Sequence, residues 1–377
     1  AWWVAGWYLL LAAVVLWGRR DLLRQPAAWA GLAAVWAVIG FASQAGGRPA
    51  GELRVIVASM GHGCGILVRS PLGRSLLYDA GRLGSPGAAR RAMAAVLWSE
   101  GVSRIDTLVV SHADADHFNA VPELLDRFAV GRLLVPASLL ASRSAGVEAL
   151  LATAALRGVP LETAAAGDSF ALDPLCRVRV HHPRWDDSVE AAAAAGGTDN
   201  ESSLVLSVEA AGRRLLLTGD LEGRALRGFL AGPLEACDVL IAPHHGSHTS
   251  LPADLAAATR PRYVLASGRV GRLWPMVQAA YVAAAGEPAE ALLTGGDGAL
   301  AVGLAADRIT LTRYSRGRWR QVSVAGDEPR PAEPGPGPRR QSTAPAEAVV
   351  SAQPAASSSN WLATYPPRSS NTPLVKP

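Results

Sequence analysis

The distribution of apolar residues divides the chain into three parts. Residues 1–45 are almost entirely apolar and contain two runs, Trp2 to Trp17 and Ala27 to Ser43, that are separated by a short basic segment. A helix of either length is about 25 Å long, close to the thickness of a bilayer core. We therefore expect two transmembrane helices in residues 1–45, and we expect them to end a longer membrane domain because the chain does not begin with Met. The alternative is a pair of buried helices in a soluble domain.

The basic segment between the two apolar runs predicts the orientation in the membrane. It contains Arg19, Arg20 and Arg24, and short loops rich in Arg and Lys stay on the cytoplasmic side. The second helix then leads the chain to the outer side of the inner or plasma membrane. We expect the rest of the protein to lie there.

Residues 51–325 alternate short β-rich runs with Gly-rich turns and amphipathic stretches, which is typical of an α/β domain. The pattern predicts a sandwich of two sheets with helices outside. The predicted strands are 53–57, 65–69, 75–78, 107–111, 133–135, 178–181, 204–208, 215–218, 239–242, 263–266, 299–303 and 309–313, and the predicted helices are 88–98, 122–128 and 145–156. Residues 326–377 are rich in Pro, Ser and Ala, so we expect a disordered tail.

Composition narrows the chemistry only slightly. The net charge of +4 is compatible with a polyanionic partner or with basic flanks of membrane helices. Cys64, Cys176 and Cys237 are far apart, odd in number and without a CxxC pair. This spacing supports neither a disulfide framework nor a cysteine zinc site, so we expect buried thiols.

Metal-ligand residue types follow three of the predicted strands. The first set is dense: His112, Asp114, Asp116 and His117 lie within six residues at the end of an apolar run. Imidazoles and carboxylates clustered at a strand end repel or need partners unless a cation compensates them, which favours a metal site. A helix cap made by either aspartate would leave both histidines unexplained.

Two later strand ends add to this set. Asp220 ends the segment Thr-Gly-Asp, and His244 and His245 lie in Pro-His-His-Gly-Ser. A single Asp after a strand is commonly a turn residue, and a His pair alone is a weak signal. The three segments in this order are specific, and they predict one metal site built from three strand ends.

In these segments the sequence resembles the metallo-β-lactamase superfamily, and within it the ComEC family of DNA-uptake proteins. The resemblance covers residues 51 to about 305 and includes a Gly-rich opening at His62, a strand that ends at Asp79, and a segment that begins near Asn200. It implies an αββα sandwich preceded by transmembrane helices. It also implies a membrane-tethered, metal-dependent hydrolase, a nuclease that degrades one strand of incoming DNA during natural transformation. The implied partners are DNA, the membrane and other DNA-uptake proteins.

The resemblance also implies roles for the residues. Two divalent ions, Zn²⁺ or Mn²⁺, are expected, with a carboxylate-rich ligand set favouring Mn²⁺ or mixed occupancy. His112 and Asp116 are assigned to catalysis, and Asp79 is expected to hydrogen-bond a ligand from behind. The implied ligand sets are His112 and Asp114 for the first ion, Asp116, His117 and one of His244 or His245 for the second, and Asp220 for both. The third ligand of the first ion stays open among His181, His182 and Asn200.

Departures from the family pattern keep two alternatives open. Asp114 stands where the superfamily usually has His, Ser59 and Cys64 stand where the family has acidic residues, and Trp274 replaces a His. The same site could therefore act on another ester, or the domain could bind DNA or metal without catalysis and gate a channel. Some arginines could follow a DNA backbone, but we find no compact motif that combines aromatic and basic residues. The arginines considered are Arg82, Arg90, Arg91, Arg213, Arg214, Arg269 and Arg272.

Overall fold

The computed structural model describes residues 51–184, 199–286 and 288–326, with short pieces of the N-terminal region at 6–8, 12, 31–36 and 38. Most of the two expected transmembrane segments and the expected tail from residue 327 onward lie outside the described residues. None of the helices in the described part of the chain has both the length and the apolar character that a bilayer crossing requires. The rings of Trp7 and Trp36 lie 5.9 Å apart, so the two apolar runs contact each other at this point.

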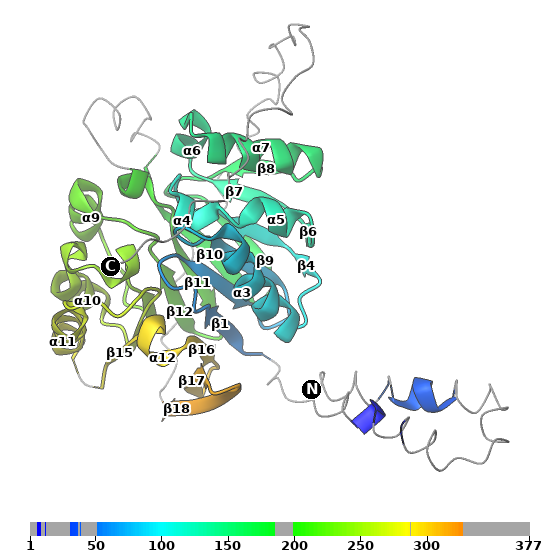
Figure 1. Cartoon of the computed structure of the whole chain (residues 1–377). Helices are drawn as coiled ribbons and strands as arrows, with labels where there is room; N and C mark the ends of the chain where they lie inside the picture. Colours follow the sequence, from blue (N-terminus) through cyan, green and yellow to red (C-terminus); the bar gives the residue numbers. More distant parts are fainter. Residues whose placement is uncertain are drawn as a thin grey trace, which may run out of the picture. The chain divides into compact units, whose positions relative to one another are not determined.

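Two β-sheets form the centre of the domain (Figure 1). The nine-stranded sheet has the order β18-β17-β16-β1-β2-β3-β5-β7-β8, and the seven-stranded sheet has the order β15-β14-β13-β12-β11-β10-β9. The strands of the first sheet are β1 (Leu53–Val57), β2 (Gly65–Arg69), β3 (Ser75–Ala80), β5 (Thr107–Val109), β7 (Leu133–Val135), β8 (Leu161–Thr163), β16 (Ala299–Leu304), β17 (Arg308–Ser315) and β18 (Arg318–Gly326). The strands of the second are β9 (Ser169–Asp173), β10 (Cys176–His182), β11 (Val205–Ala210), β12 (Arg213–Leu217), β13 (Val239–Ile241), β14 (Tyr263–Ala266) and β15 (Glu290–Leu293). A small separate pair consists of β4 (Arg104–Ile105) and β6 (Ala129–Val130).

Helices cover the outer face of each sheet, which confirms the expected αββα sandwich. Helices α3, α5 and α7 pack on the first sheet, and α9, α10 and α11 pack on the second. The helices are α3 (Pro86–Ser99), α4 (Ala115–Phe118), α5 (Val121–Leu125), α6 (Ala137–Ala141), α7 (Ala145–Leu156), α9 (Gly223–Leu230), α10 (Pro252–Thr259), α11 (Trp274–Ala285) and α12 (Thr294–Asp297).

Strand β1 illustrates why the central strands are apolar on both faces. Leu53, Val55 and Val57 point into the core between the sheets, whereas Ile56 packs into the core beneath the helices. Successive side chains of a strand point to opposite faces, so a strand with helices on one side and a sheet on the other needs apolar residues at both. Because both faces of these strands are buried in apolar cores, the candidate ligands lie at the strand ends.

Two of the arginines considered for DNA contact have structural roles instead. The Arg213 side chain is buried, donates to the carbonyl oxygens of Ala305 and Ala306 at 3.1 Å each, and lies 3.4 Å from an oxygen of Asp238. It joins the start of β12 to the turn between β16 and β17. Arg214 forms ion pairs with Glu209 and Glu235. For these two residues the expectation of a DNA-contacting surface is wrong.

Candidate metal centre

Asp79, at the end of β3, organises the loop that carries the first ligand set. Its carboxylate is fully buried and accepts hydrogen bonds from the Ser111 N–H at 2.7 Å, the Ser111 hydroxyl at 2.8 Å and His117 Nδ1 at 2.8 Å. Asp79 has a φ of 59°, a left-handed conformation that Asp adopts more readily than most residues. The expected contact between Asp79 and a candidate ligand is confirmed.

His112 and His117 are held side by side at the end of β5. Their ring centroids are 4.2 Å apart and both side chains are buried. The Ser111 hydroxyl donates to Asp79, so it can accept from His112 Nδ1, which lies 2.8 Å away. Both histidines therefore use Nδ1 as a donor, and in the neutral ring Nε2 presents its lone pair.

Asp220 faces these two rings from the second sheet. One of its carboxylate oxygens is 3.2 Å from His117 Nε2, and ligand atoms of His112, His117 and Asp220 all lie within 4.8 Å of one another. Gly219 makes this approach possible. Its φ is +56°, and a Cβ there would come within 3.0 Å of Tyr78 Oη and Ser203 Cβ.

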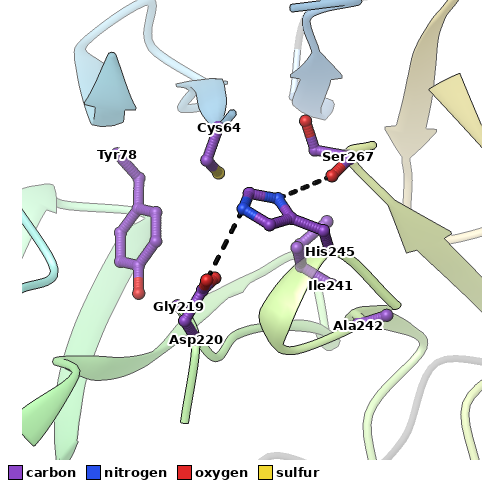
Figure 2. A pocket seen from close by; sticks show the side chains of 8 residues that line it. All are labelled: Cys64, Tyr78, Gly219, Asp220, Ile241, Ala242, His245 and Ser267. Atoms are coloured by element: carbon purple, nitrogen blue, oxygen red, sulfur yellow. Dashed lines mark hydrogen bonds and ion pairs between the residues drawn. The ribbon is translucent and has the colours of Figure 1, made fainter. Parts of the chain in front are cut away.

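His245, after β13, completes the constellation from the other side. Its Nδ1 donates to the Ser267 carbonyl at 2.8 Å, so Nε2 presents a lone pair in the neutral ring and donates to Asp116 in the protonated ring. That nitrogen lies 3.2 Å from an Asp116 oxygen and 3.5 Å from an Asp220 oxygen. Figure 2 shows the His245 ring between Asp220 and Ser267 in a small pocket. His62 extends this side of the site, since ligand atoms of His62, Asp116 and His245 lie within 4.8 Å of one another.

Of the remaining two expected ligands, His244 faces another partner, and Asp114 lies half-exposed beside His112. His244 and His245 both have positive φ, 49° and 55°, and this rare conformation turns the rings toward different partners. His244 Nδ1 bonds to Glu222 at 2.8 Å, away from the other rings. Asp114 is half-exposed, with an oxygen 3.7 Å from His112 Nε2. Of the His pair, the structure brings His245 into the site.

The structure distinguishes the three candidates for a further ligand. His181 Nε2 bonds to the Ser207 hydroxyl at 2.8 Å, and His182 Nδ1 bonds to the Ser203 carbonyl at 2.9 Å. Asn200 is buried, and its Nδ2 donates to Glu222 at 2.7 Å. Asn200 Oδ1 is buried without a hydrogen-bond partner in the described part of the chain, and the third ligand of the first ion stays open among the three.

Electrostatics show that the site is suited to a cation. Burial disfavours a charge on His117, but the carboxylates of Asp220 and Asp79 outweigh burial and raise its pKa well above the usual value. Burial likewise opposes ionisation of Asp116, but the hydrogen bond from His245 and the charge of His117 lower its pKa to about 2. Lone pairs aimed at ionised carboxylates repel unless a proton or a metal ion lies between them.

Two buried imidazole nitrogen atoms also indicate a place for a cation. Nε2 of His112 and Nε2 of His117 are buried, and neither has a hydrogen bond within the described residues. Leaving such an atom unsatisfied costs about 1–3 kcal/mol. Two such nitrogen atoms lie next to each other beside an ionised carboxylate. This arrangement fits the ligation of a divalent metal ion.

A third group of potential ligands, Cys64, Asp79 and His117, fits a metal less well. His117 Nδ1 and Asp79 already bond to each other, and burial followed by the charge of Asp79 raises the pKa of the Cys64 thiol well above its usual value. The thiol therefore stays protonated. All three cysteines are free and buried, as expected from their spacing.

Three residues that hydrogen-bond the candidate imidazoles were not found from the sequence. Ser111, Glu222 and Ser267 bond to His112, His244 and His245 respectively. Glu222 lies two residues after Asp220 and could have been noticed as a second carboxylate at that strand end. Ser111 and Ser267 carry no signal of this kind, because a single Ser near a strand end is usually a turn residue.

Comparisons with known proteins agree with this geometry. A family model described as "Metallo-beta-lactamase superfamily" matches residues 65–267. The chain is 30% identical over 172 residues to "ComE operon protein 3" of Bacillus subtilis (strain 168), and 30% identical over 243 residues to "Competence protein ComA" of Neisseria gonorrhoeae. These matches cover 45% and 62% of this chain but only 21% and 30% of the respective relatives.

Solved structures are more distant. The "CmlA beta-hydroxylase" is 15% identical, with a TM-score of 0.43 over 78% of this chain and 62% of the other. Zn²⁺-bound PqqB from Methylobacterium extorquens is 14% identical, with a TM-score of 0.37 over 64% of this chain and 96% of the other. Because both TM-scores lie below 0.5, neither likeness bears on function.

Proposed function

Because the chain belongs to the metallo-beta-lactamase superfamily, we propose that it is a metal-dependent hydrolase that cleaves phosphodiester bonds of DNA. The observation that supports this proposal is the set of three imidazoles, His112, His117 and His245, whose Nε2 atoms face Asp116 and Asp220. Each ring is fixed from behind through Nδ1. A carboxylate or a carbonyl that accepts from the rear nitrogen is the usual support of a metal-binding imidazole.

We assign the binding of two divalent ions, Zn²⁺ or Mn²⁺, to these five residues. Divalent ions held here would supply Lewis-acid catalysis, which suits the charge that develops on a phosphodiester during hydrolysis. Asp116 stays ionised near neutral pH, since its pKa is about 2, and it is positioned to accept a proton from an attacking water. Burial by the two sheets keeps the other ligand groups away from bulk solvent.

The choice of DNA as substrate rests on the context of the site. Both curated relatives carry names that refer to competence or to its operon, and the net charge of this chain is +4. We propose that the enzyme degrades one strand of incoming DNA during natural transformation, together with other DNA-uptake proteins. We also propose that the apolar runs in residues 1–45 tether it to the inner or plasma membrane, with the hydrolase on the outer side.

The test uses the full chain with single-stranded DNA, Mn²⁺ or Zn²⁺, and measures both bound metal and cleavage. Asp116→Asn should lower the cleavage rate by at least about 100-fold, since a group that moves a proton contributes about that much. Asp307→Asn removes an exposed carboxylate elsewhere and should leave the rate unchanged. Metal binding without turnover would favour a gating role, and hydrolysis of small esters alone would favour another substrate.

A further inference from the structure

The hairpin of β17 and β18 carries a concentration of positive charge that the sequence analysis did not single out. Residues 308–326 contain five arginines and no acidic residue. Arg313, Arg316, Arg318 and Arg320 lie within eight positions, and all four are exposed. Tyr314 is 43% exposed and pairs with Trp319, so it lies on the opposite face of the hairpin from Arg313 and Arg320.

The register of the hairpin places most of this charge on one face. Arg313 pairs with Arg320 and Ser315 pairs with Arg318, and cross-strand partners point to the same face of a sheet. The same face of β17 contributes Leu311 to the core between the sheets. The arginines are therefore turned toward the side of the second sheet, and the ion pair from Arg313 to Asp297 of α12, at 3.4 Å, agrees with this direction.

These charges are not used to hold the fold together. Within the described part of the chain, Arg316, Arg318 and Arg320 form no ion pair, and Arg313 has only the 3.4 Å contact with Asp297. Like charges placed opposite each other in a sheet destabilise it. Exposed arginines that repel one another, three of them without an ion pair in the described residues, favour an anionic partner.

The sheet register also places the tip of the hairpin at the same ends of the strands as the candidate metal centre. One continuous row of paired residues runs from Arg320 through Arg313, Leu300, Val57, Ile66 and Tyr78 to Val109. Asp79 is the next residue after Tyr78, and His112 follows Val109 by three positions. The tip of the hairpin, at Arg316, therefore extends beyond the row on the same side as the ligands.

A second loop lies between the hairpin and the ligands. The chain after β14 runs from Ser267, whose carbonyl holds His245, to the exposed Arg269 and Arg272. This loop touches α12, since a Cβ on Gly295 would lie 2.8 Å from Arg269 Cα. Figure 1 shows α12 beside the strands that form the hairpin. Arginines thus occur at successive points along the edge.

We propose that the arginine face of the β17–β18 hairpin binds the backbone of single-stranded DNA and, with Arg269 and Arg272, leads the strand to the metal centre. The inference deepens the proposed nuclease function and depends on it for the identity of the ligand. Five strand spacings of about 4.8 Å separate β18 from β3, so the path is about 24 Å long. Single-strand binding surfaces cover ~4–16 nucleotides, and a path of this length offers room for several backbone phosphates.

The experiment measures binding separately from cleavage. The full chain is titrated, in EDTA, into a fluorescein-labelled oligo(dT) of about 20 nucleotides, and anisotropy is recorded between about 50 and 200 mM salt. The variant combines Arg316→Gln, Arg318→Gln and Arg320→Gln. The matched control combines Arg104→Gln, Arg127→Gln and Arg177→Gln, which removes the same charge from exposed positions near the opposite ends of the strands.

The hairpin variant should bind at least about 10-fold more weakly, and its salt slope should fall by about 2, since each lost phosphate contact on a single strand contributes about 0.7. The control should resemble the wild type, and three Arg→Lys changes in the hairpin should restore binding, because charge is what the backbone recognises. Equal losses in variant and control, or a wild type that does not bind, would overturn the inference. The same proteins are also tested with anionic phospholipid vesicles. If the hairpin variant loses binding to the vesicles but not to the oligonucleotide, the inference is overturned in favour of a membrane-facing surface.

The two proposals can fail independently in this design. If the wild type binds the oligonucleotide through the hairpin but never cleaves it with Mn²⁺ or Zn²⁺, the nuclease proposal fails and the binding surface stands. If the hairpin variant both binds and cleaves as the wild type does, the nuclease proposal stands and the surface is refuted. Thermal unfolding of each variant checks that the exposed substitutions leave the fold intact.

Discussion

Replacing Asp79 by Asn should damage the metal centre without touching a metal ligand. The substitution keeps the size of the side chain, and Asn adopts the left-handed backbone conformation of residue 79 as readily as Asp does. What changes is the hydrogen bonding. The carboxylate accepts from the Ser111 N–H, the Ser111 hydroxyl and His117 Nδ1, whereas an amide offers one accepting oxygen and one donating nitrogen.

The consequence for His117 follows from that count. If the amide oxygen continues to accept from the Ser111 N–H, the amide nitrogen faces His117 Nδ1, and two donors then oppose each other. His117 can relieve this contact only by moving its proton from Nδ1 to Nε2, which removes the lone pair that would bind a metal. The opposite amide orientation leaves the buried Ser111 N–H without an acceptor, at a cost of about 1–3 kcal/mol.

We therefore expect Asp79→Asn to lower metal affinity by about 10–100-fold, the range found when the support of a metal-binding imidazole is removed. Competition of the full chain against a chelator of known affinity measures this value, and long-range ¹H–¹⁵N spectra of the metal-free protein report the His117 tautomer. Asp307→Asn is the matched control, since it makes the same chemical change at an exposed position. Wild-type affinity together with an unchanged tautomer in Asp79→Asn would refute the reasoning.

Four further outcomes are expected. Glu222→Gln should leave metal affinity and thermal stability nearly unchanged, since its partner His244 lies outside the group of candidate ligands and one acceptor oxygen remains for it; chelator competition and thermal unfolding measure them. Arg213→Met should lower the free energy of unfolding by about 3–5 kcal/mol, because it leaves Asp238 buried without its cation; denaturant titration measures it. Metal affinity should rise with pH, because a raised pKa makes His117 hold a proton that the metal must displace until the pH exceeds that pKa; chelator competition at several pH values checks the sign. The three buried cysteines should react with a thiol reagent only after unfolding, which a timed colorimetric assay shows.

The central strands were predictable because burial on both faces leaves a clear pattern. The expected strand at residues 53–57 and the expected helix at 145–156 coincide with β1 and α7. The strands β8 and β18 were missed, and both lie at edges of the first sheet. All residues of β8 are exposed, and exposed and intermediate residues dominate β18. An edge strand packs too few apolar side chains to stand out from a loop.

The candidate ligands could be recognised for a different reason, since chemistry rather than periodicity marks them. The sequence analysis expected four of these residues, namely His112, Asp116, His117 and Asp220. In the structure their ligand atoms lie within a few ångströms of one another or of His245. The choice between His244 and His245 could not be made from the sequence. It depends on two consecutive left-handed backbone positions, and such a conformation is set by the surrounding packing rather than by local preference.

The hairpin surface and the metal centre share a cause in the topology. Strands β16, β17 and β18 are antiparallel, so each connection between them reverses the chain and alternate connections fall at the same edge. The turn between β16 and β17 lies at the far edge, where Arg213 binds it, and the tip after β17 returns to the edge of the ligands. A sequence pattern that marks only strands and turns does not reveal which turns share an edge. Strand register does, and it places a basic tip and a metal-binding loop along one path on the molecule.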